Sequence, residues 1–274
     1  IQKVIFPFPL AWLLRRHRRK IVFDFDDAIF TVEAPAQNWL DRIRRHQADF
    51  GLSQMLRSAE HAIVENGYTG RYAKQFCEHV SVITGPVDTD RYLPSRRDVG
   101  SEVVLGWIGS RSTEPYLELI RDPLVELGRR YKQLRLFLIG ANVFEVEELR
   151  VIRRDWSLET EGADLSKFDV GLMPLPDDPW TRGKGGYKIL QYQAVGIPVV
   201  ASPVGINREI VEPGVNGFLA STASEWVEHL ERLIHDSALR RRMGDAGRMK
   251  TEAEYSLKTS RSRFFHILES VAKV

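Results

Sequence analysis

The sequence has little cysteine, little net charge and no long hydrophobic run. Its 274 residues include a single cysteine, Cys77, which excludes an internal disulfide and fits a reducing compartment. The formal net charge of +2 gives no bulk electrostatic reason to expect nucleic acid as a partner. No stretch reaches the roughly 18 apolar residues that a membrane span needs, and the nearest, residues 4–14, is interrupted by Pro7 and Pro9. We therefore expect a cytoplasmic protein.

Several motifs of known chemistry are also absent. The seven histidines show no spacing typical of metal ligands, so we expect no metal site. Neither the Gly-x-Ser-x-Gly elbow of hydrolases nor a Walker A motif occurs. Gly106 and Gly109 have the wrong spacing for a dinucleotide fingerprint. These absences argue against a serine hydrolase, a P-loop enzyme and an enzyme with a dinucleotide cofactor, and we expect no cofactor.

The residues that are present predict a globular α/β protein. Hydrophobic residues make up 43% and charged residues 28%, and a prior of about 150 residues per domain suggests two domains. Short apolar runs alternate with helical patterns, which predicts parallel sheets with crossover helices. The predicted strands are residues 4–6, 21–25, 62–64, 80–83, 103–108, 134–139, 169–173, 198–201 and 217–219. The predicted helices are residues 38–57, 70–76, 116–131, 187–195, 225–235, 238–244 and a last one from 256.

The most informative segment is rich in glycine and leads into a predicted helix. Residues 183–186 read Gly-Lys-Gly-Gly, and the helix that follows ends before Gly196. Main-chain N–H groups and the dipole at a helix N-terminus favour an anion. Lys184 and Lys188 add positive charge within about one turn. The segment therefore suits a diphosphate held without a metal, although an ordinary basic surface helix explains the same residues equally well.

The helix and the strand after it are part of a longer pattern. The pattern comprises Lys188 with residues 194–200, and further segments at residues 87–92, 106–110, 202–205, 209–211 and 214–219. In this order and spacing it resembles family 4 of the retaining nucleotide-sugar glycosyltransferases (glycosyltransferase group 1), across nearly the whole chain. The resemblance implies the GT-B fold, in which two Rossmann-like α/β domains with parallel sheets face a cleft.

The resemblance also implies how the chain is divided. A turn-rich stretch at residues 84–100 is typical of a linker. The expected parts are a partial acceptor-side domain at residues 1–95, a domain for the donor nucleotide-sugar at 96–255, and a C-terminal helix at 256–274 that crosses back to the first domain. Because the chain enters a strand-like segment at Ile1, we expect the first domain to be incomplete.

Donor contacts are implied after the first strand of the second domain and around the glycine-rich turn. Lys188 is expected to be catalytic as well, by stabilising the leaving diphosphate. For Arg111 a solvated loop arginine is the alternative. Trp180, which precedes the glycine-rich turn, suits either stacking on the sugar or base of the donor or a place in a mobile lid. The full set is Gly109, Ser110, Arg111, Arg182, Lys184, Gly185, Gly186, Tyr187, Lys188, Gln191 and Glu209.

Two positions depart from the family pattern. The family has a pair of acids around the glycine-rich turn, and Gly183 and Gln191 stand in their places. An amide can donate to and accept from hydroxyl groups, so Gln191 is expected to keep the contact with the ribose. The main-chain N–H groups of residues 185–187 are expected to replace part of the first acid's contact with the sugar.

An acidic cluster follows the predicted strand at residues 21–25. Its carboxylates suit a bound cation, a helix cap or catalysis. The family places a histidine or an acidic pair here, facing the donor sugar, so the catalytic role is carried over to Asp26 or Asp27. Asp24 is the alternative, because it alternates with Phe23 and Phe25.

The resemblance implies transfer of a sugar from a UDP- or GDP-sugar to a hydroxyl, with retention, in cell-surface polysaccharide or glycolipid synthesis. The expected partners are the nucleotide-sugar and a saccharide or lipid-linked acceptor. Residues 12–20, from Trp12 to Lys20, join apolar and basic residues and suit either docking on the inner face of a membrane or a basic surface helix. A nucleotide-sugar epimerase and a non-catalytic nucleotide-sugar-binding module are the alternative functions.

Overall fold

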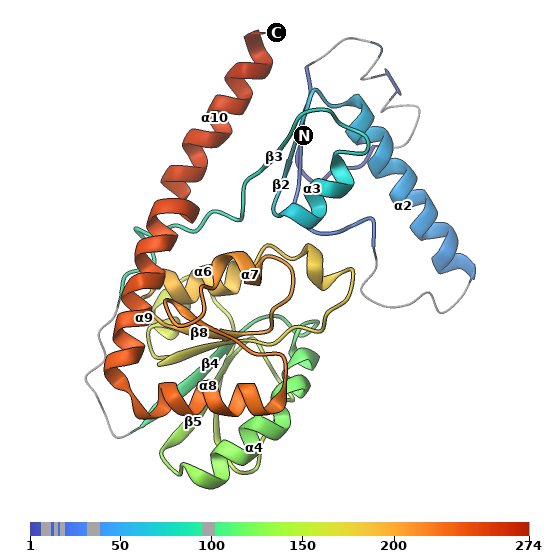
Figure 1. Cartoon of the computed structure of the whole chain (residues 1–274). Coiled ribbons are helices and arrows are strands. Elements are labelled where there is room, and N and C mark those ends of the chain that lie inside the picture. Colours follow the sequence, from blue (N-terminus) through green and yellow to red (C-terminus); the bar gives the residue numbers. More distant parts are fainter. Residues whose placement is uncertain (7–11, 14–15, 17–19, 32–38, 95–101, 274) are drawn as a thin grey trace. The chain divides into compact units, whose positions relative to one another are not determined.

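The computed structural model describes residues 1–6, 12–13, 16, 20–31, 39–94 and 102–273. The chain forms two compact units, which are coloured along the sequence in Figure 1. Unit 1 comprises Ile1–Pro86, Asp177–Gly185 and Lys258–Val274, and unit 2 comprises Val87–Pro176 and Gly186–Leu257. The segment Asp177–Gly185, which contains most of the glycine-rich turn, therefore clusters with unit 1, whereas Gly186 and the helix after it cluster with unit 2.

Unit 1 contains a three-stranded parallel sheet in the order β1-β2-β3. The side chains of β1 that point inward, Phe23 and Phe25, stack with ring centroids 5.6 Å apart and pack against Leu52, Met55 and Leu56 of α2. The elements are β1 (Val22–Phe25), α2 (Trp39–Ser58), β2 (His61–Val64), α3 (Gly67–Ala73), β3 (Val80–Val82) and α10 (Leu257–Lys273). Near the end of α10, Lys20 Nζ donates to the carbonyl of Ala272 at 2.9 Å.

The predicted strand at residues 4–6 is wrong. The main chain pairs with β1 slightly earlier, where Asp24 donates to the carbonyl of Ile1 and accepts from the amide of Lys3, both at 2.9 Å. The apolar side chains that suggested a strand, Ile5 and Phe6, pack on the core of the unit from irregular chain. Their hydrophobicity reflects burial and not strand pairing.

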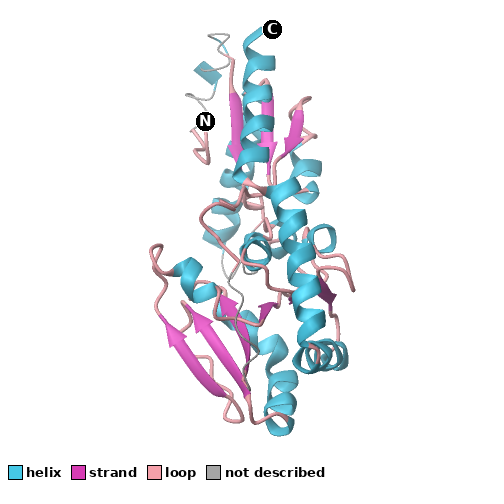
Figure 2. Cartoon of the chain, turned by 90° about the vertical axis from the view of Figure 1, so that its left-hand side faces the viewer, coloured by secondary structure: helices cyan, strands magenta, loops and turns pink. Residues whose placement is uncertain are grey.

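Unit 2 contains a six-stranded parallel sheet in the order β6-β5-β4-β7-β8-β9 (Figure 2, strands in magenta). In sequence order from β4 this is 3-2-1-4-5-6, the order of dinucleotide-binding folds, so the chain reverses direction across the sheet between β4 and β7. The strands are β4 (Val103–Ile108), β5 (Leu134–Ile139), β6 (Arg150–Arg154), β7 (Val170–Met173), β8 (Val199–Ala201) and β9 (Gly217–Leu219).

Both faces of this sheet are buried, as expected for a parallel sheet with crossover helices. Val103, Leu105 and Trp107 of β4 pack with α4 and α8, which lie side by side in Figure 1, whereas Val104 and Ile108 pack with α5 and α6. The helical elements are η1 (Glu114–Ile120), α4 (Arg121–Arg130), α5 (Glu161–Leu165), η2 (Thr181–Gly183, in unit 1), α6 (Tyr187–Ala194), α7 (Asn207–Ile210), α8 (Ala223–His235), α9 (Ser237–Lys250) and η3 (Thr251–Tyr255).

No helix in the described part of the chain is long and apolar enough to cross a membrane. Of the segment proposed for membrane docking, residues 14–15 and 17–19 lie outside the described residues, so that prediction stays a prediction. Trp12 is 47% exposed, and the guanidinium of Arg16 lies 5.2 Å from the centroid of its ring.

Candidate active site

Lys188 lies at the carboxyl end of β4, where the sheet of unit 2 reverses its strand order. It belongs to the first turn of α6, and its Nζ donates to Thr113 Oγ1 at 3.2 Å. The same ammonium lies 4.3 Å from the centroid of the Trp107 ring, which belongs to β4 and is buried. Ligands of open α/β sheets bind at this kind of switch point. The structure therefore brings Lys188 together with the loop after β4.

Gly109 and Gly140 allow the loops after β4 and β5 to approach each other closely. A Cβ at Gly109 would lie 2.3 Å from the Trp107 ring and 2.6 Å from Lys188 Nζ. A Cβ at Gly140, which has φ of +79°, would lie 2.1 Å from the carbonyl oxygen of Gly109. Larger residues would push apart the groups that hold the Lys188 ammonium. These two glycines are therefore part of how the site is built.

Lys188 is the second residue of α6, so it lies in the first turn of this helix. The helix begins after Gly186, which has φ of +69° and provides no side-chain cap. Tyr187, the first helical residue, is 43% exposed. The dipole of the helix and the Lys188 charge thus act on the same place and favour an anion there.

The loop after β4 is held by its own hydrogen bonds. Thr113 donates from its amide to the carbonyl of Ser110 at 3.0 Å, and Ser110 Oγ lies 3.0 Å from Ser112 Oγ. The exposed Arg111 lies beside Asn142, whose amide oxygen accepts from Arg111 Nε at 2.7 Å when it faces the guanidinium. Arg111 is thus held against the loop after β5, within unit 2.

Gln191 is buried inside a hydrogen-bond network that sequence reasoning missed. Its Nε2 donates to the hydroxyl of Tyr92 at 3.1 Å. That hydroxyl donates to Glu161, whose carboxylate also accepts from the indole N–H of Trp156. Burial, followed by the Glu161 hydrogen bond, raises the pKa of Tyr92. The amide assigned to the ribose is thus also a structural link between α6 and the stretch predicted as the linker.

Glu209 lies among a different set of neighbours. Its side chain is exposed, and Lys250 Nζ donates to its carbonyl oxygen at 2.9 Å. Burial and the charges of Glu254 and Glu209 raise the pKa of Tyr255 to about 12. The interactions of Glu209 in the described part of the chain are therefore with residues of α9 and η3. They do not bring it together with Lys188.

The acids of unit 1 gather where β1 and β2 end. Asp26 forms an ion pair with Lys3. Burial, followed by the charge of Asp26, raises the pKa of Asp24. Sequence reasoning missed Glu65, which directly follows β2. Burial, followed by the charges of Asp26 and Asp27, raises its pKa to about 7.

The two predicted cations before Gly185 make their described contacts inside unit 1. Arg182 forms an ion pair with Asp177 at 2.6 Å. The Lys184 ammonium lies 5.2 Å from the centroid of the Trp180 ring. The main chain of this segment packs on the ends of β1 and β2, since a Cβ at Gly185 would lie 2.0 Å from Glu65 Oε2.

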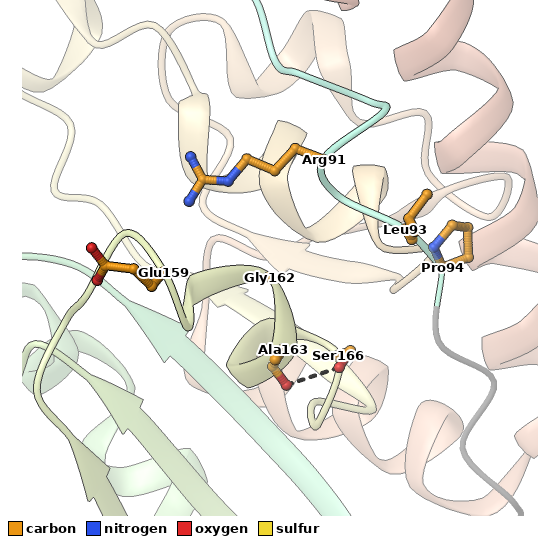
Figure 3. A pocket seen from close by; sticks show the side chains of 7 residues that line it. All are labelled: Arg91, Leu93, Pro94, Glu159, Gly162, Ala163 and Ser166. Carbon is orange, nitrogen blue, oxygen red and sulfur yellow. Dashed lines mark hydrogen bonds between the residues drawn. The ribbon is translucent and has the colours of Figure 1, made fainter.

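A surface pocket of about 330 Å³ lies elsewhere in unit 2 (Figure 3). It contains none of the predicted site residues, and its lining includes Pro94, the last described residue before residue 102. Its lining is Arg91, Leu93, Pro94, Glu159, Gly162, Ala163 and Ser166. In the described part of the chain, no group of three histidine, cysteine, aspartate or glutamate residues is arranged to hold a metal ion.

Residues 179–250 match the family model of the group 1 glycosyl transferases, and this range contains the glycine-rich turn, α6 and Glu209. Over this range the chain is similar to the group 1 glycosyltransferases. Solved structures agree on the fold. Sucrose-phosphate synthase from Thermosynechococcus elongatus is 17% identical with a TM-score of 0.72, covering 96% of this chain and 71% of the other. HepE from Anabaena, solved with UDP-glucose, is 19% identical with a TM-score of 0.72, covering 95% of this chain and 75% of the other.

One curated relative is similar in sequence to part of this chain. It is the GDP-mannose-dependent monoacylated alpha-(1-6)-phosphatidylinositol monomannoside mannosyltransferase of Corynebacterium glutamicum, 34% identical over 113 residues. The match covers 39% of this chain and only 29% of the relative. The likeness to the solved structures establishes the GT-B fold, with two α/β units that each contain a parallel sheet.

Proposed function

We propose that this chain transfers a sugar from a UDP- or GDP-sugar to a hydroxyl acceptor, with retention at the anomeric carbon. The observation that carries the proposal is the Lys188 ammonium, which lies against Gly109 and Thr113 at the switch point of unit 2. A cation, a helix N-terminus and a glycine-lined strand end meet there, and this combination suits a pyrophosphate.

The reaction places a growing negative charge on the leaving nucleoside diphosphate. Lys188 and the N-terminus of α6 would stabilise this charge more strongly in the transition state than in the ground state, which is what accelerates a reaction. Arg111 would add a second cation from the loop after β4. Asp26 or Asp27 would face the donor sugar from the end of β1. Gln191 would contact the ribose as the amide counterpart of the acid usual in the family.

Relatives support a nucleotide-sugar as the donor, and they are compatible with either uracil or guanine as its base. HepE is described in complex with UDP-glucose, and the mannosyltransferase of Corynebacterium glutamicum is named for GDP-mannose. The latter acts on a phosphatidylinositol monomannoside, which makes a lipid-linked acceptor the more specific proposal for this chain. A place in polysaccharide or glycolipid synthesis on the cytoplasmic side of a membrane, contacted through residues 12–20, would follow from such an acceptor.

A thermal-shift screen tests the donor assignment. Only ligands that bind the folded state raise the melting temperature, by an amount that grows with concentration over the dissociation constant. UDP, GDP and their sugars are expected to raise it, whereas nucleoside monophosphates, which lack the second phosphate, are expected to have a smaller effect. Equal shifts for mono- and diphosphates would contradict a site built around the pyrophosphate.

A non-catalytic nucleotide-sugar-binding module is the second candidate. The burial of Gln191 and its bond to Tyr92 favour it, because they give this amide a structural use. Incubation of the donor with and without a panel of saccharide and lipid acceptors separates the candidates. A transferase forms product only with an acceptor, an epimerase converts the donor alone, and a binding module does neither.

A further inference from the structure

Asn66 has two uses at once in unit 1. It follows Glu65 at the end of β2, is 1% exposed, and caps α3 by accepting from the amides of Tyr68 and Thr69 at 2.9 and 3.0 Å. Its Nδ2 points the other way and donates to the carbonyl of Lys184 at 3.0 Å and to that of Arg182 at 3.4 Å. Only a side chain with both an acceptor and a donor group can make these bonds together.

Two close contacts fix the same stretch of chain beside Asn66. A Cβ at Gly183 would lie 2.2 Å from the Cβ of Ala28, just beyond β1. A Cβ at Gly185 would lie 2.0 Å from Glu65 Oε2. Thr84 Oγ1 in turn donates to the carbonyl of Glu65 at 2.9 Å, which holds the end of β2 in place. A side chain at position 183 would thus meet the main chain just beyond β1, whereas one at position 185 would meet the end of the Glu65 side chain.

We propose that the turn Glu65–Asn66 is a clamp on the glycine-rich loop, and that Asn66 is a positioning residue for sugar transfer. The second half of this proposal rests on the proposed function. Asn66 donates to the carbonyls of residues 182 and 184, and the carboxylate of Glu65 lies against residue 185. The next residues of the chain, Gly186 and Tyr187, start the helix that carries Lys188. The clamp therefore holds the stretch of unit 1 that directly precedes this helix in the chain.

The clamp explains why an asparagine stands at this cap. Serine and aspartate are equally good N-caps, so capping α3 alone would be served by either. Aspartate has no donor for the two carbonyls and would place negative charge beside their oxygen atoms. Serine is too short to span from the helix cap to the loop. Asparagine is the side chain that satisfies both demands in this buried place.

The test compares Asn66→Ser and Asn66→Asp with Thr69→Val. The serine and aspartate variants keep the cap and lose the bonds to the loop, whereas Thr69→Val removes the hydroxyl that accepts from the main-chain N–H of Asn66 in the capping box and keeps the Nδ2 donor of Asn66. Hydrogen exchange of the full chain is measured for the amides of residues 182–187. Because one net hydrogen bond contributes about 1 kcal/mol, both Asn66 variants are expected to speed exchange there by roughly fivefold or more. Thr69→Val is expected to leave it unchanged.

A clamp that acts on transfer is expected to separate turnover from nucleotide affinity. With a UDP- or GDP-sugar and an acceptor, Asn66→Ser is expected to lower kcat about tenfold and to change the dissociation constant for UDP or GDP less than about threefold. The reason is that the main-chain N–H groups of residues 185–187 are proposed to contact the sugar, whereas Lys188, proposed to bind the diphosphate, makes its described contacts with Thr113 and Trp107 of unit 2.

Each result has a separate meaning. Unchanged exchange in the loop of both Asn66 variants would overturn the clamp. Faster exchange with an unchanged kcat, or an equal loss of kcat in Thr69→Val, would overturn the role in transfer. If the unmodified chain bound neither UDP nor GDP, the proposed function and the role in transfer would both fail, while the exchange data would still report on the clamp itself.

Discussion

The Lys188 ammonium lies over the face of the Trp107 indole ring, 4.3 Å from its centroid. Trp107 is 1% exposed and belongs to β4, so its ring cannot move without disturbing the core of unit 2. A cation–π contact of this kind contributes about 0.5–2 kcal/mol. The pair therefore fixes a positive charge at the carboxyl end of β4. Because the Lys188 side chain is already held, less of its conformational entropy would be lost when a diphosphate binds.

Gly109→Ala is expected to weaken binding of UDP and GDP by displacing this pair. The new Cβ would lie 2.6 Å from Lys188 Nζ and 2.3 Å from the Trp107 ring. We expect a loss of about 1–3 kcal/mol of stability from overpacking, together with at least tenfold weaker binding by calorimetry. Gly214→Ala is the control, because Gly214 has φ of +83° and nothing within 4 Å of its Cβ position. The control is expected to lose stability and keep its affinity, and equal affinities in both variants would refute the prediction.

Gly185→Ala is expected to destabilise unit 1 because its Cβ would meet the Glu65 carboxylate. Because the atoms it meets are the end of a flexible side chain, we expect a loss at the low end of overpacking costs, about 1 kcal/mol in the free energy of unfolding measured with denaturant. Adding Glu65→Ala to this variant removes the clashing atoms. The double variant is therefore expected to be more stable than the sum of the two single changes predicts, and strict additivity would show that the two residues do not press on each other.

Glu65→Gln is expected to change how stability depends on pH. The folded-state pKa of Glu65 is about 7, above its ordinary value of 4.5, so the folded protein holds this proton more tightly than the unfolded chain does. The stabilisation of the folded state that comes from this proton is thus fully present below about pH 4.5, and it is lost as pH rises through about 7. A glutamine does not titrate. The stability of the variant relative to the unmodified chain is therefore expected to rise between about pH 5 and pH 8 in denaturant titrations, and a difference that stays constant would contradict the assignment.

Arg248→Lys is expected to destabilise unit 2. Its guanidinium donates to the carbonyls of Thr89, Tyr92 and Ala194 and pairs with Glu252. A lysine ammonium cannot reproduce this forked geometry on a largely buried side chain. Hydrogen bonds from a charged group contribute about 1.5–3 kcal/mol each, so we expect a loss of at least about 2 kcal/mol in the free energy of unfolding. A loss as small as that of Arg150→Lys, at an exposed position of β6, would contradict this account.

Strand and helix patterns predicted most of the described secondary structure because strands buried on both faces are short continuous apolar runs and the helices between them have one apolar face. The pattern failed at β6, whose sequence Arg-Val-Ile-Arg-Arg belongs to an edge strand with exposed ends and lacks the apolar run of a central strand. It failed in the other direction at residues 4–6, where Ile5 and Phe6 are apolar because they cover a core.

The site was predictable where residues are near one another in the sequence and less so where contacts are long-range. The glycine-rich turn and Lys188 carry a local pattern, and the loop after β4 follows from the rule on strand ends. Contacts that join distant segments left no such signal: Tyr92 with Gln191, and Asn66 with the carbonyl of Lys184. The one sign of the second contact was an asparagine at a helix start, which capping alone explains.

The central claim is that the Lys188 ammonium binds the diphosphate of a nucleotide-sugar. It is tested most directly by calorimetric titration of UDP and GDP into the unmodified chain, Lys188→Ala and Lys167→Ala. Lys167 is a matched control, since its ammonium also lies near an aromatic ring, 5.7 Å from the centroid of Phe137. It precedes β7 and so lies at the amino end of that strand, whereas Lys188 lies near the carboxyl end of β4. We predict that Lys188→Ala weakens binding by at least about tenfold, or roughly 1.4 kcal/mol, and that Lys167→Ala has no effect. Equal affinity in all three proteins would contradict the account.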